Sequence, residues 1–333
     1  MKYLKGISIA LVILLVVYFI GPRPDSVTID NNPVSIDVSL DQLSQFVQDK
    51  EDATPHLKPG NAAQIIWADS IHEKTAYSLV YLHGFSASHE EGAPINKEIA
   101  KRYGMNLYLS RISGHGTNES DPFGQLTVED MVNSAKEAVA IGKLLGDNVI
   151  VMSCSTGGTF GLYLAANDPD IASLILYSPN IDLYDQTSDV LLAPWGLQIA
   201  RLISGGKQRT FEATEDVQKY WTTTYRLEGA VALKQLLQET MRPDIFQKIT
   251  QPVFIGYYYK SELEQDNVIS VEKILEMNGQ LGTADSNKII KAFADVGNHA
   301  INSKYFSKDV ASVRKETINF LEKNMGLIPT SRD

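Results

Sequence analysis

Short apolar runs rich in β-branched and aromatic residues alternate with helical patterns along most of this chain, and this alternation constrains the fold most strongly. We expect strands at residues 64–67, 78–82, 106–112, 148–152, 172–177, 252–259 and 288–293. Strands separated by helices favour right-handed crossovers and a mostly parallel sheet. Thr127 and Asp130 have the spacing of a capping box, which predicts a helix start. The sequence therefore predicts an α/β fold.

A serine stands where one of these strands meets the next helical pattern. The segment Ser153-Cys154-Ser155-Thr156-Gly157 follows the apolar run 149–152. A sharp turn at such a boundary exposes a serine hydroxyl, and it needs small neighbours because the backbone is crowded there. The usual pattern is G-x-S-x-G, and here Ser153 replaces the first glycine. The outward-pointing residue is the one two before Gly157, so Ser155, not Cys154, is the candidate nucleophile.

A second loop follows the strand that ends at Leu82, with the sequence His83-Gly84-Phe85-Ser86. Acyl transfer needs two backbone N–H groups aimed at the developing oxyanion, one from the residue after the nucleophile and one from a loop of this kind. We expect Thr156 and Phe85 to supply them. The place of His83 beside a glycine favours a ring that braces the loop by hydrogen bonds over a catalytic base.

Together, the strand ending in His83-Gly84-Phe85, the later segment Ser113-Gly114-His115-Gly116 and the serine elbow resemble the α/β-hydrolase fold. Within that fold the chain is most similar to the monoacylglycerol lipase, carboxylesterase and serine aminopeptidase-like group, over about residues 64–321. The resemblance implies a mostly parallel twisted sheet flanked by helices. It also implies a catalytic triad that runs Ser, then Asp or Glu, then His along the chain.

The base and the acid of that triad are sought after Ser155. Of the six histidines only His299 follows the elbow, after the expected strand 288–293, where the resemblance places the base. For the acid we choose Asp266, because Asp266-Asn267-Val268 resembles the family pattern that leads into the next helix. The family usually has Gly-x-x-Asp directly after the penultimate strand, which this chain lacks, so Glu262 and Glu264 remain alternatives.

Residues 181–251 interrupt the alternation, since they show helical patterns at about 191–203 and 229–241 but no convincing strand. An insertion of this length predicts a helical cap. Several large apolar residues of the cap are candidates for a ligand pocket, although packing against the sheet is the favoured interpretation for each: Trp195, Leu197, Ile199, Leu202, Trp221 and Tyr225. The expected domains are an N-terminal segment 1–24, a spacer 25–62, a hydrolase core 63–180 and 252–327, and the cap 181–251.

The N-terminus carries an almost unbroken apolar run from Ile7 to Ile20, preceded by Lys2 and Lys5. Bulky residues at its end do not suit signal cleavage, so an uncleaved membrane anchor is favoured over a cleaved signal. The two lysines predict that the catalytic part lies on the extracytoplasmic side. A secreted or periplasmic protein is the alternative. The spacer that follows contains a short amphipathic pattern, with Leu40, Leu43, Phe46 and Val47 on its apolar face, and we expect it to pack onto the domain.

Composition and motifs exclude several function classes. With 30 basic and 40 acidic residues the formal net charge is -10, which disfavours nucleic-acid binding. We expect no metal and no cofactor, since neither metal-ligand spacing nor a phosphate-binding glycine loop occurs. The expected function is therefore a serine hydrolase that cleaves small-molecule esters or lipids. An aminopeptidase using Asp182, Asp185 and Asp189 to bind an amine, a thioesterase, and a non-catalytic binding protein remain alternatives.

Overall fold

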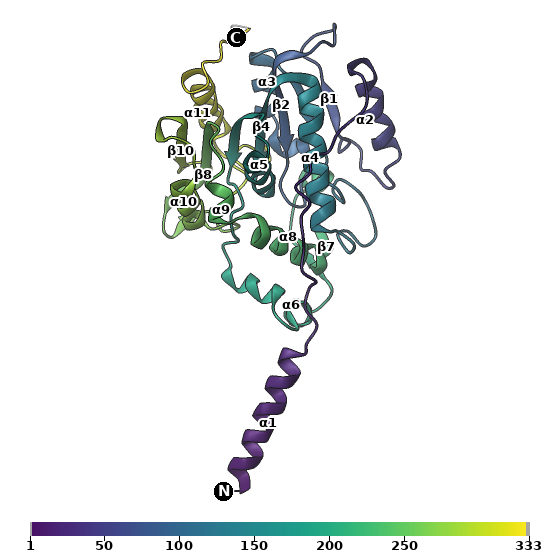
Figure 1. Cartoon of the computed structure of the whole chain (residues 1–333), viewed down its shortest axis with the longest axis vertical. Coiled ribbons are helices and arrows are strands. Elements are labelled where there is room, and N and C mark those ends of the chain that lie inside the picture. The colour runs from purple at the N-terminus through teal and green to yellow at the C-terminus, as the bar shows by residue number, and fades with distance from the viewer. Residues whose placement is uncertain (1, 331–333) are drawn as a thin grey trace.

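The structure of the chain is a computed structural model, which describes residues 2–330. Its centre is an eight-stranded sheet in the order β1-β3-β2-β4-β5-β8-β10, with β9 paired to β8 (Figure 1). All seven expected strands are confirmed. The strands are β1 (Gln64–Ile66), β2 (Thr75–Leu82), β3 (Asn106–Leu109), β4 (Gly146–Cys154), β5 (Ile171–Tyr177), β8 (Val253–Ser261), β9 (Glu264–Gln265) and β10 (Lys288–Phe293).

The sheet is mostly parallel, as expected. Strand β1 runs antiparallel to β3, and β9 runs antiparallel to β8. The pairs from β3 through β2, β4, β5 and β8 to β10 are all parallel. The carboxyl ends of these strands therefore meet at one edge of the sheet, which is where open α/β sheets bind ligands.

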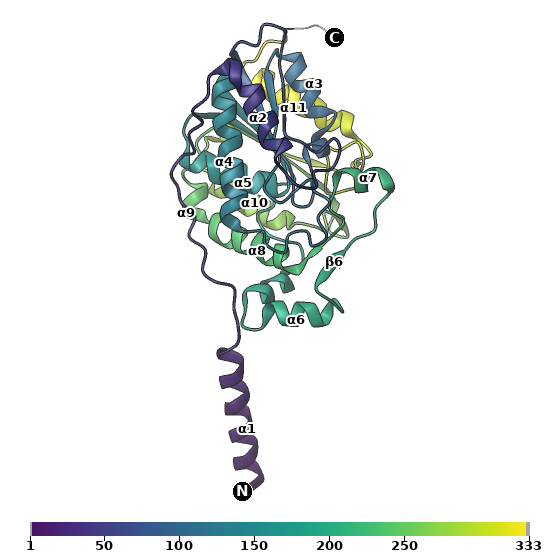
Figure 2. The same ribbon diagram turned by 90° about the vertical axis from the view of Figure 1, so that its right-hand side faces the viewer.

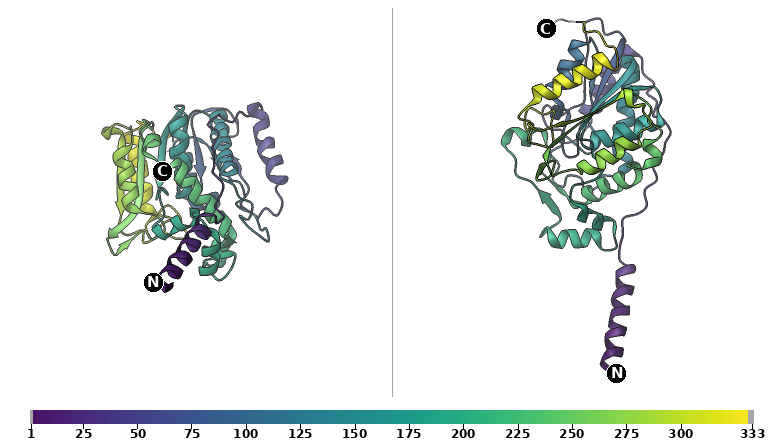
Figure 3. Two further views of the ribbon diagram at one scale, coloured as in Figure 1. Left: turned by 60° about the horizontal axis from the view of Figure 1, so that its bottom comes forward. Right: turned by 90° about the vertical axis from the view of Figure 1, so that its left-hand side faces the viewer.

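Helices cover both faces of the sheet, because alternate residues of the central strands point to opposite sides. Val80 and Leu82 pack with α4 (Val128–Leu145) and α5 (Thr156–Asn167), whereas Leu79 and Tyr81 pack with α3 (Ile95–Arg102) and α11 (Val310–Lys323). Figure 3 shows α11 and α10 (Val271–Gln280) on opposite sides of the sheet. The short helix α9 (Pro243–Phe246) also belongs to this part.

The predicted start of α4 is confirmed. The Thr127 hydroxyl accepts a hydrogen bond from the Asp130 N–H at 3.1 Å, and it donates to the Asp130 carboxylate at 2.6 Å. This side chain satisfies one of the amides that a helix N-terminus leaves without an intrahelical acceptor. The cap fixes where α4 begins, and α4 in turn covers β2 and β4.

Residues 181–251 contain the expected helices, α6 (Gly196–Ile203) and α8 (Leu227–Thr240), with α7 (Glu215–Tyr220) between them. The expectation of no strand was wrong, because β6 (Gln208–Thr210) and β7 (Thr224–Arg226) form an antiparallel pair. All three residues of β6 are exposed. Their polar side chains bury no apolar face, so no hydrophobic alternation marks them in the sequence.

The large apolar residues of this region have different surroundings. Trp221 packs with Tyr305 and Phe306, and Tyr225 packs with Phe85 near the serine elbow. Leu202, in contrast, is 83% exposed on α6. The six residues therefore do not line one common apolar pocket, and Tyr225 is the one that reaches the candidate site.

The N-terminal run forms α1 (Lys2–Phe19), which projects from the end of the molecule where α6 lies (Figures 1 and 2). Within residues 2–330 no helix is both long and apolar enough to cross a bilayer, so the expected anchor is not supported.

Residues 25–62 pack against the body of the molecule. Helix α2 (Leu43–Asp52) of this segment buries Leu43 and Val47. Before α2 the chain runs along the outside of the body beside α4 (Figure 2), where the Lys136 ammonium donates to the Asn32 carbonyl at 2.9 Å. Near α1, the Trp195 N–H donates to the Pro22 carbonyl at 2.9 Å. The spacer thus connects opposite ends of the molecule.

Candidate active site

Ser155 lies at the turn between β4 and α5 with a strained backbone, at φ 53° and ψ −121°. A non-glycine residue with positive φ is uncommon and persists only where its surroundings enforce it. Its N–H donates to the Tyr177 carbonyl at 2.9 Å, which ties the turn to β5. A Cβ on Gly157 would lie 2.0 Å from the Leu82 carbonyl oxygen, so only glycine fits there. The structure therefore has the sharp turn that the sequence predicts.

The neighbours of Ser155 are buried. Ser153, which replaces the usual glycine, is fully buried and fits without disturbing the turn. Cys154 is buried as well, and burial raises the pKa of its thiol well above the ordinary value. A thiol held protonated is a poor nucleophile. Ser155 itself is 8% exposed.

His299 and Asp266 meet at the same edge of the sheet. Nδ1 of His299 lies 2.6 Å from Oδ2 of Asp266. The other oxygen, Oδ1, accepts the N–H groups of Val268 at 2.9 Å and Ile269 at 3.2 Å. The Asp266 carboxylate is thus buried and held from both sides. Because Nδ1 donates to a carboxylate, Nε2 of the neutral ring is left as the acceptor.

In the described chain Nε2 of His299 is buried and has no hydrogen-bond partner. It makes no hydrogen bond with Ser155, and catalytic hydrogen bonds often tighten only when substrate binds. Ser178, one residue after β5, donates a hydrogen bond from Oγ to the His299 carbonyl at 2.7 Å. This bond connects the loop after β5 with the loop that carries His299. A buried imidazole nitrogen without a partner is the group that a base needs at this position.

Two opposing effects set the proton affinity of His299. Burial lowers its pKa, whereas the charge and hydrogen bond of Asp266 and the charge of Glu91 raise it. The carboxylates prevail, so the pKa of His299 lies above its ordinary value. This is the direction required of a base that must hold a proton during the reaction.

The two alternative acids do not contact His299. Glu262 is exposed and accepts a hydrogen bond from the Tyr259 hydroxyl at 2.8 Å. Glu264 is exposed and pairs with Lys260 at 2.9 Å. Both belong to the β8–β9 hairpin that extends beyond the sheet. This hairpin lengthens the chain before the acid, which explains why Gly-x-x-Asp is missing after β8.

The loop after β2 forms a turn in which the Ala87 N–H donates to the Gly84 carbonyl at 3.2 Å. Nδ1 of His83 lies 2.9 Å from the same carbonyl oxygen, and Nε2 accepts the Ile112 N–H at 3.0 Å. Burial lowers the pKa of His83 well below its ordinary value, so the ring is neutral. His83 therefore braces this loop, as the sequence indicated.

The Phe85 side chain packs in an aromatic cluster with His115, Phe123 and Tyr225, at ring-centroid distances of 5.5, 4.9 and 5.4 Å. The next residue, Ser86, accepts the Thr222 N–H through its carbonyl at 2.7 Å. The loop that carries the Phe85 amide is therefore held by the cap. Burial lowers the pKa of His115 to about 4, so this ring stays neutral.

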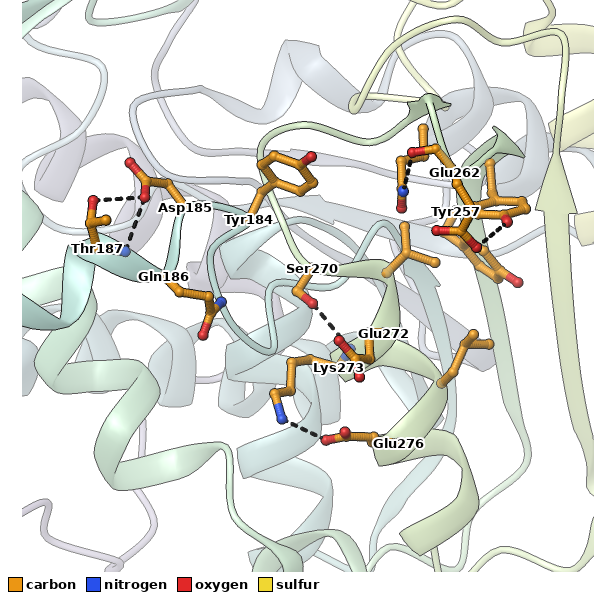
Figure 4. A pocket seen from close by; sticks show the side chains of 14 residues that line it. Tyr184, Asp185, Gln186, Thr187, Tyr257, Glu262, Ser270, Glu272, Lys273 and Glu276 are labelled. Atoms are coloured by element: carbon orange, nitrogen blue, oxygen red, sulfur yellow. Dashed lines mark hydrogen bonds and ion pairs between the residues drawn. The ribbon is translucent and has the colours of Figure 1, made fainter.

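A cavity of about 330 Å³ is lined by Asp266 and His299, together with residues of the β8–β9 hairpin. A larger cavity of about 1290 Å³ lies beside it, between the hairpin, α10 and residues 184–187 (Figure 4). The two share Tyr184, Glu262 and Gln265. Most charged groups of the larger cavity are acidic, and its Lys273 pairs with Glu276 at 2.7 Å (Figure 4).

Two of the three acids considered for amine binding are already paired. The Lys234 ammonium lies 2.6 Å from both Asp182 and Asp189. Asp185 accepts the N–H and the hydroxyl of Thr187 at 3.0 and 2.7 Å (Figure 4). The Lys234 ammonium thus already occupies the position beside Asp182 and Asp189 that a free amine would take, which disfavours amine binding by these two acids.

Sequence reasoning missed one acidic residue at the site. Glu91 lies in a short 3-10 helix (His89–Gly92) and is 3% exposed. Its Oε2 accepts the Gly84 N–H at 2.8 Å and the Tyr81 hydroxyl at 3.1 Å. The only signal in the sequence is a pair of glutamates a few residues after the His83-Gly84 loop, which is indistinguishable from a solvated surface.

Comparisons with known proteins agree on the fold. The catalogued family described as the alpha/beta hydrolase fold matches residues 77–286. A thermostable monoacylglycerol lipase from Bacillus sp. (strain H-257) is 31% identical over 111 residues, which cover 33% of this chain and 44% of that enzyme. The chain thus matches less than half the length of this curated relative.

Solved structures of lipolytic enzymes share the fold at low sequence identity. A metagenome-derived lipolytic enzyme superposes with a TM-score of 0.65 at 14% identity, covering 80% of this chain and 99% of that one. A soluble variant of the monoglyceride lipase of Saccharomyces cerevisiae gives 0.60 at 14% identity, covering 79% and 91%. The monoacylglycerol lipase of Paleococcus ferrophilus gives 0.58 at 14% identity, covering 79% and 98%. With the family match over most of its core, this chain belongs to the α/β-hydrolase fold family.

Proposed function

We propose that this chain is a serine hydrolase that cleaves carboxylic esters, with an uncharged lipid ester of the monoacylglycerol type as the substrate class. The observation that carries the proposal is the contact between His299 and Asp266 at the sheet edge where Ser155 occupies a strained turn. The named activity of the Bacillus relative supports the substrate class. The aromatic cluster around Phe85 offers apolar surface for such a substrate.

In the first step Oγ of Ser155 attacks the ester carbonyl carbon while Nε2 of His299 takes the hydroxyl proton. The carbonyl π electrons move onto oxygen, which becomes an oxyanion. Asp266 stays ionised, holds the ring through Nδ1 and stabilises the imidazolium. When the tetrahedral intermediate collapses, the C–O bond to the alcohol breaks and His299 returns the proton to the leaving alkoxide. Water then hydrolyses the acyl-enzyme by the same sequence.

The oxyanion would be held by the N–H groups of Phe85 and Thr156. Thr156 is the first residue of α5, where an amide has no intrahelical acceptor and the helix dipole favours negative charge. Phe85 is the second residue of the turn closed by Ala87 and Gly84, so its amide is not used in closing that turn. Both amides belong to segments that are held rigidly, by α5 and by His83.

We propose the domain division 63–180 and 252–327 for the core, with 181–251 as the cap and 25–62 as the spacer. The contact of Tyr225 with Phe85 supports a role for the cap in enclosing the substrate. A thioesterase would use the same groups, so substrate assays must decide between ester and thioester. An aminopeptidase is disfavoured because Lys234 already pairs with Asp182 and Asp189.

The test is a substrate panel with the full chain. Monoacylglycerols and p-nitrophenyl esters of increasing chain length would be compared with acyl thioesters and aminoacyl anilides. The proposal predicts ester hydrolysis that is lost in Ser155→Ala and kept in Ser153→Ala. Faster turnover of anilides or thioesters than of esters would show that the substrate class is an amide or a thioester. If no substrate of the panel is turned over, the proposal that the chain is a hydrolase is wrong.

A further inference from the structure

One buried acid of the site, Glu91, has no role in the mechanism above; it is 3% exposed. Glu91 forms no ion pair with any lysine or arginine in the described chain, although neighbouring Glu90 pairs with Lys97 and Lys304. Burying an unpaired carboxylate is expensive, and such groups concentrate where a protein uses them. The contacts of Glu91 indicate what that use is.

The first contact fixes the loop that carries the Phe85 amide. Oε2 of Glu91 accepts the Gly84 N–H at 2.8 Å, while the Gly84 carbonyl is held by His83. Both peptide groups that flank the Gly84 Cα are therefore fixed. Because a trans peptide points its C=O and N–H in opposite directions, the Phe85 N–H is forced to point away from His83.

Gly84 lies between Glu91 and Ser155, and because it has no side chain the two residues can come close together. A Cβ built on Gly84 would lie 2.8 Å from Oε1 of Glu91 and 3.1 Å from Cβ of Ser155. The Glu91 carboxyl thus lies directly behind the residue that borders Ser155. A movement of this carboxyl would be transmitted to the oxyanion loop through one peptide group.

The second contact reaches the histidine loop. The Tyr81 hydroxyl, which donates to Glu91 at 3.1 Å, accepts a hydrogen bond from Nδ2 of Asn302 at 3.1 Å. Asn302 is fully buried and lies three residues after His299. A single carboxyl therefore connects the oxyanion loop, β2 and the loop that carries the base.

The charges around Glu91 are few. Facing it are Tyr81 from β2, Cys154 from β4 and His299 from the loop after β10, with Asp266 also close to Cys154. On its own element, burial lowers the pKa of His89 to about 4, so that ring is neutral. Among these facing groups, His299 is the one that can carry a positive charge.

The electrostatic effects run in both directions. Burial raises the pKa of Glu91 to about 7, although the Gly84 bond and the charge of His299 oppose the rise. In turn, the Glu91 charge contributes to the raised pKa of His299. An anion at this place favours the imidazolium that forms when Ser155 loses its proton.

We propose that Glu91 is a positioning residue of the active site, which holds the oxyanion loop through Gly84 and supplies a second negative charge that favours protonated His299. The inference rests on the ester-hydrolase function proposed above. It assigns two separable roles to one side chain, an acceptor for the Gly84 N–H and an anion near the base. Substitutions that preserve one role and remove the other can test each of them.

Glu91→Gln keeps an oxygen acceptor and removes the charge. We expect kcat to fall about tenfold, and we expect the acid limb of the kcat/KM profile to move to lower pH by about half a unit or more, because His299 loses a neighbouring anion. Glu90→Gln is the matched control, since it removes the same charge from the adjacent residue, which pairs with Lys97 and Lys304 instead. Its acid limb should coincide with that of the wild type.

Glu91→Asp keeps the charge and shortens the reach to Gly84. We expect a lower kcat, with the acid limb of the kcat/KM profile at the same pH as in the wild type. If Glu91→Gln does not fold, this variant still tests whether the hydrogen bond to the Gly84 N–H positions the loop. A Glu91→Gln profile that coincides with the wild type overturns the inference, as does a uniform loss with no shift of the limb. If Glu91→Asp has the kcat of the wild type, Glu91 does not position the loop through the Gly84 N–H.

The failure of this inference can be told apart from failure of the proposed function. If the wild type hydrolyses esters and Ser155→Ala does not, the hydrolase stands whatever the Glu91 variants do. If the wild type hydrolyses no ester, the proposed function fails first, and the roles assigned to Glu91 fail with it.

Discussion

Nδ1 of His299 lies 2.6 Å from Oδ2 of Asp266, and two backbone amides hold the other oxygen of that carboxylate. The carboxylate is buried, so its orientation does not depend on solvent. It fixes the tautomer of His299 in which Nε2 can accept a proton. The exposed glutamates of the β8–β9 hairpin make no such contact.

Asp266→Asn should lower kcat by about 10⁴ while the fold is retained, because an amide at this position favours the wrong tautomer of the base. Steady-state hydrolysis of a p-nitrophenyl ester measures the effect. Glu262→Gln and Glu264→Gln are the matched controls and should stay within a fewfold of the wild type. Near-normal activity of Asp266→Asn, or a large loss in either control, would show that the acid was misassigned.

His83→Ala should lower kcat by about 10- to 100-fold with little change in KM, because the Phe85 amide loses the brace that orients it toward the oxyanion. His89→Ala is a suitable control, since His89 is equally buried but bonds to the Ala62 carbonyl, away from this loop. Both variants would be assayed with one ester over a range of concentrations. Equal losses of kcat in both would contradict a specific role for His83.

Gly157→Ala should destabilise the fold by about 1–3 kcal/mol or prevent folding, because its Cβ would overlap the Leu82 carbonyl oxygen. Gly279→Ala is the opposite case. Gly279 lies inside α10 with nothing within 4 Å of an added Cβ, so alanine should stabilise the chain by about 0.5–1 kcal/mol. Urea unfolding of the two variants measures both changes, and a neutral Gly157→Ala would contradict the crowded turn.

The strands and the turn at Ser155 could be predicted from sequence because each depends on local signals, whereas Asp266 and His299 were chosen with the help of the family resemblance. The apolar runs mark buried strands, and the small residues around Ser155 mark a crowded turn. Asp266 was identifiable from the residues that follow it, even though the β8–β9 hairpin displaces it along the chain. His299 follows from its place after the last strand.

Other features arise from tertiary contacts that leave no local pattern. Glu91 becomes a site residue only because Gly84, Tyr81 and the histidine loop surround it. Strand β6 has only exposed polar residues, so hydrophobic periodicity does not reveal the β6–β7 pair. The pairing of Lys234 with Asp182 and Asp189 joins segments far apart in the sequence. The first helix follows the apolar run that the sequence shows.

Glu91 should make stability depend on pH in a defined direction. Its pKa rises from 4.5 to about 7 on folding, so the folded state binds more protons than the unfolded state between these values. Protonated Glu91 contributes fully to the free energy of unfolding below about pH 4.5. This contribution, roughly 3 kcal/mol in total, is lost as the pH rises through 7.

Thermal unfolding of the wild type and of Glu91→Gln at several pH values measures this dependence. The stability of Glu91→Gln relative to the wild type should increase as pH rises from about 5 to 8. A difference between the two that is constant over this range would mean that Glu91 titrates at its ordinary pKa.

The proposed nucleophile is Ser155, activated by His299. Intact-mass analysis after treatment with a fluorophosphonate, followed by identification of the modified peptide, tests this assignment. We expect one adduct per chain, located on Ser155, absent from Ser155→Ala and strongly slowed in His299→Ala. An unlabelled wild-type chain, or an adduct on any other residue, would contradict it.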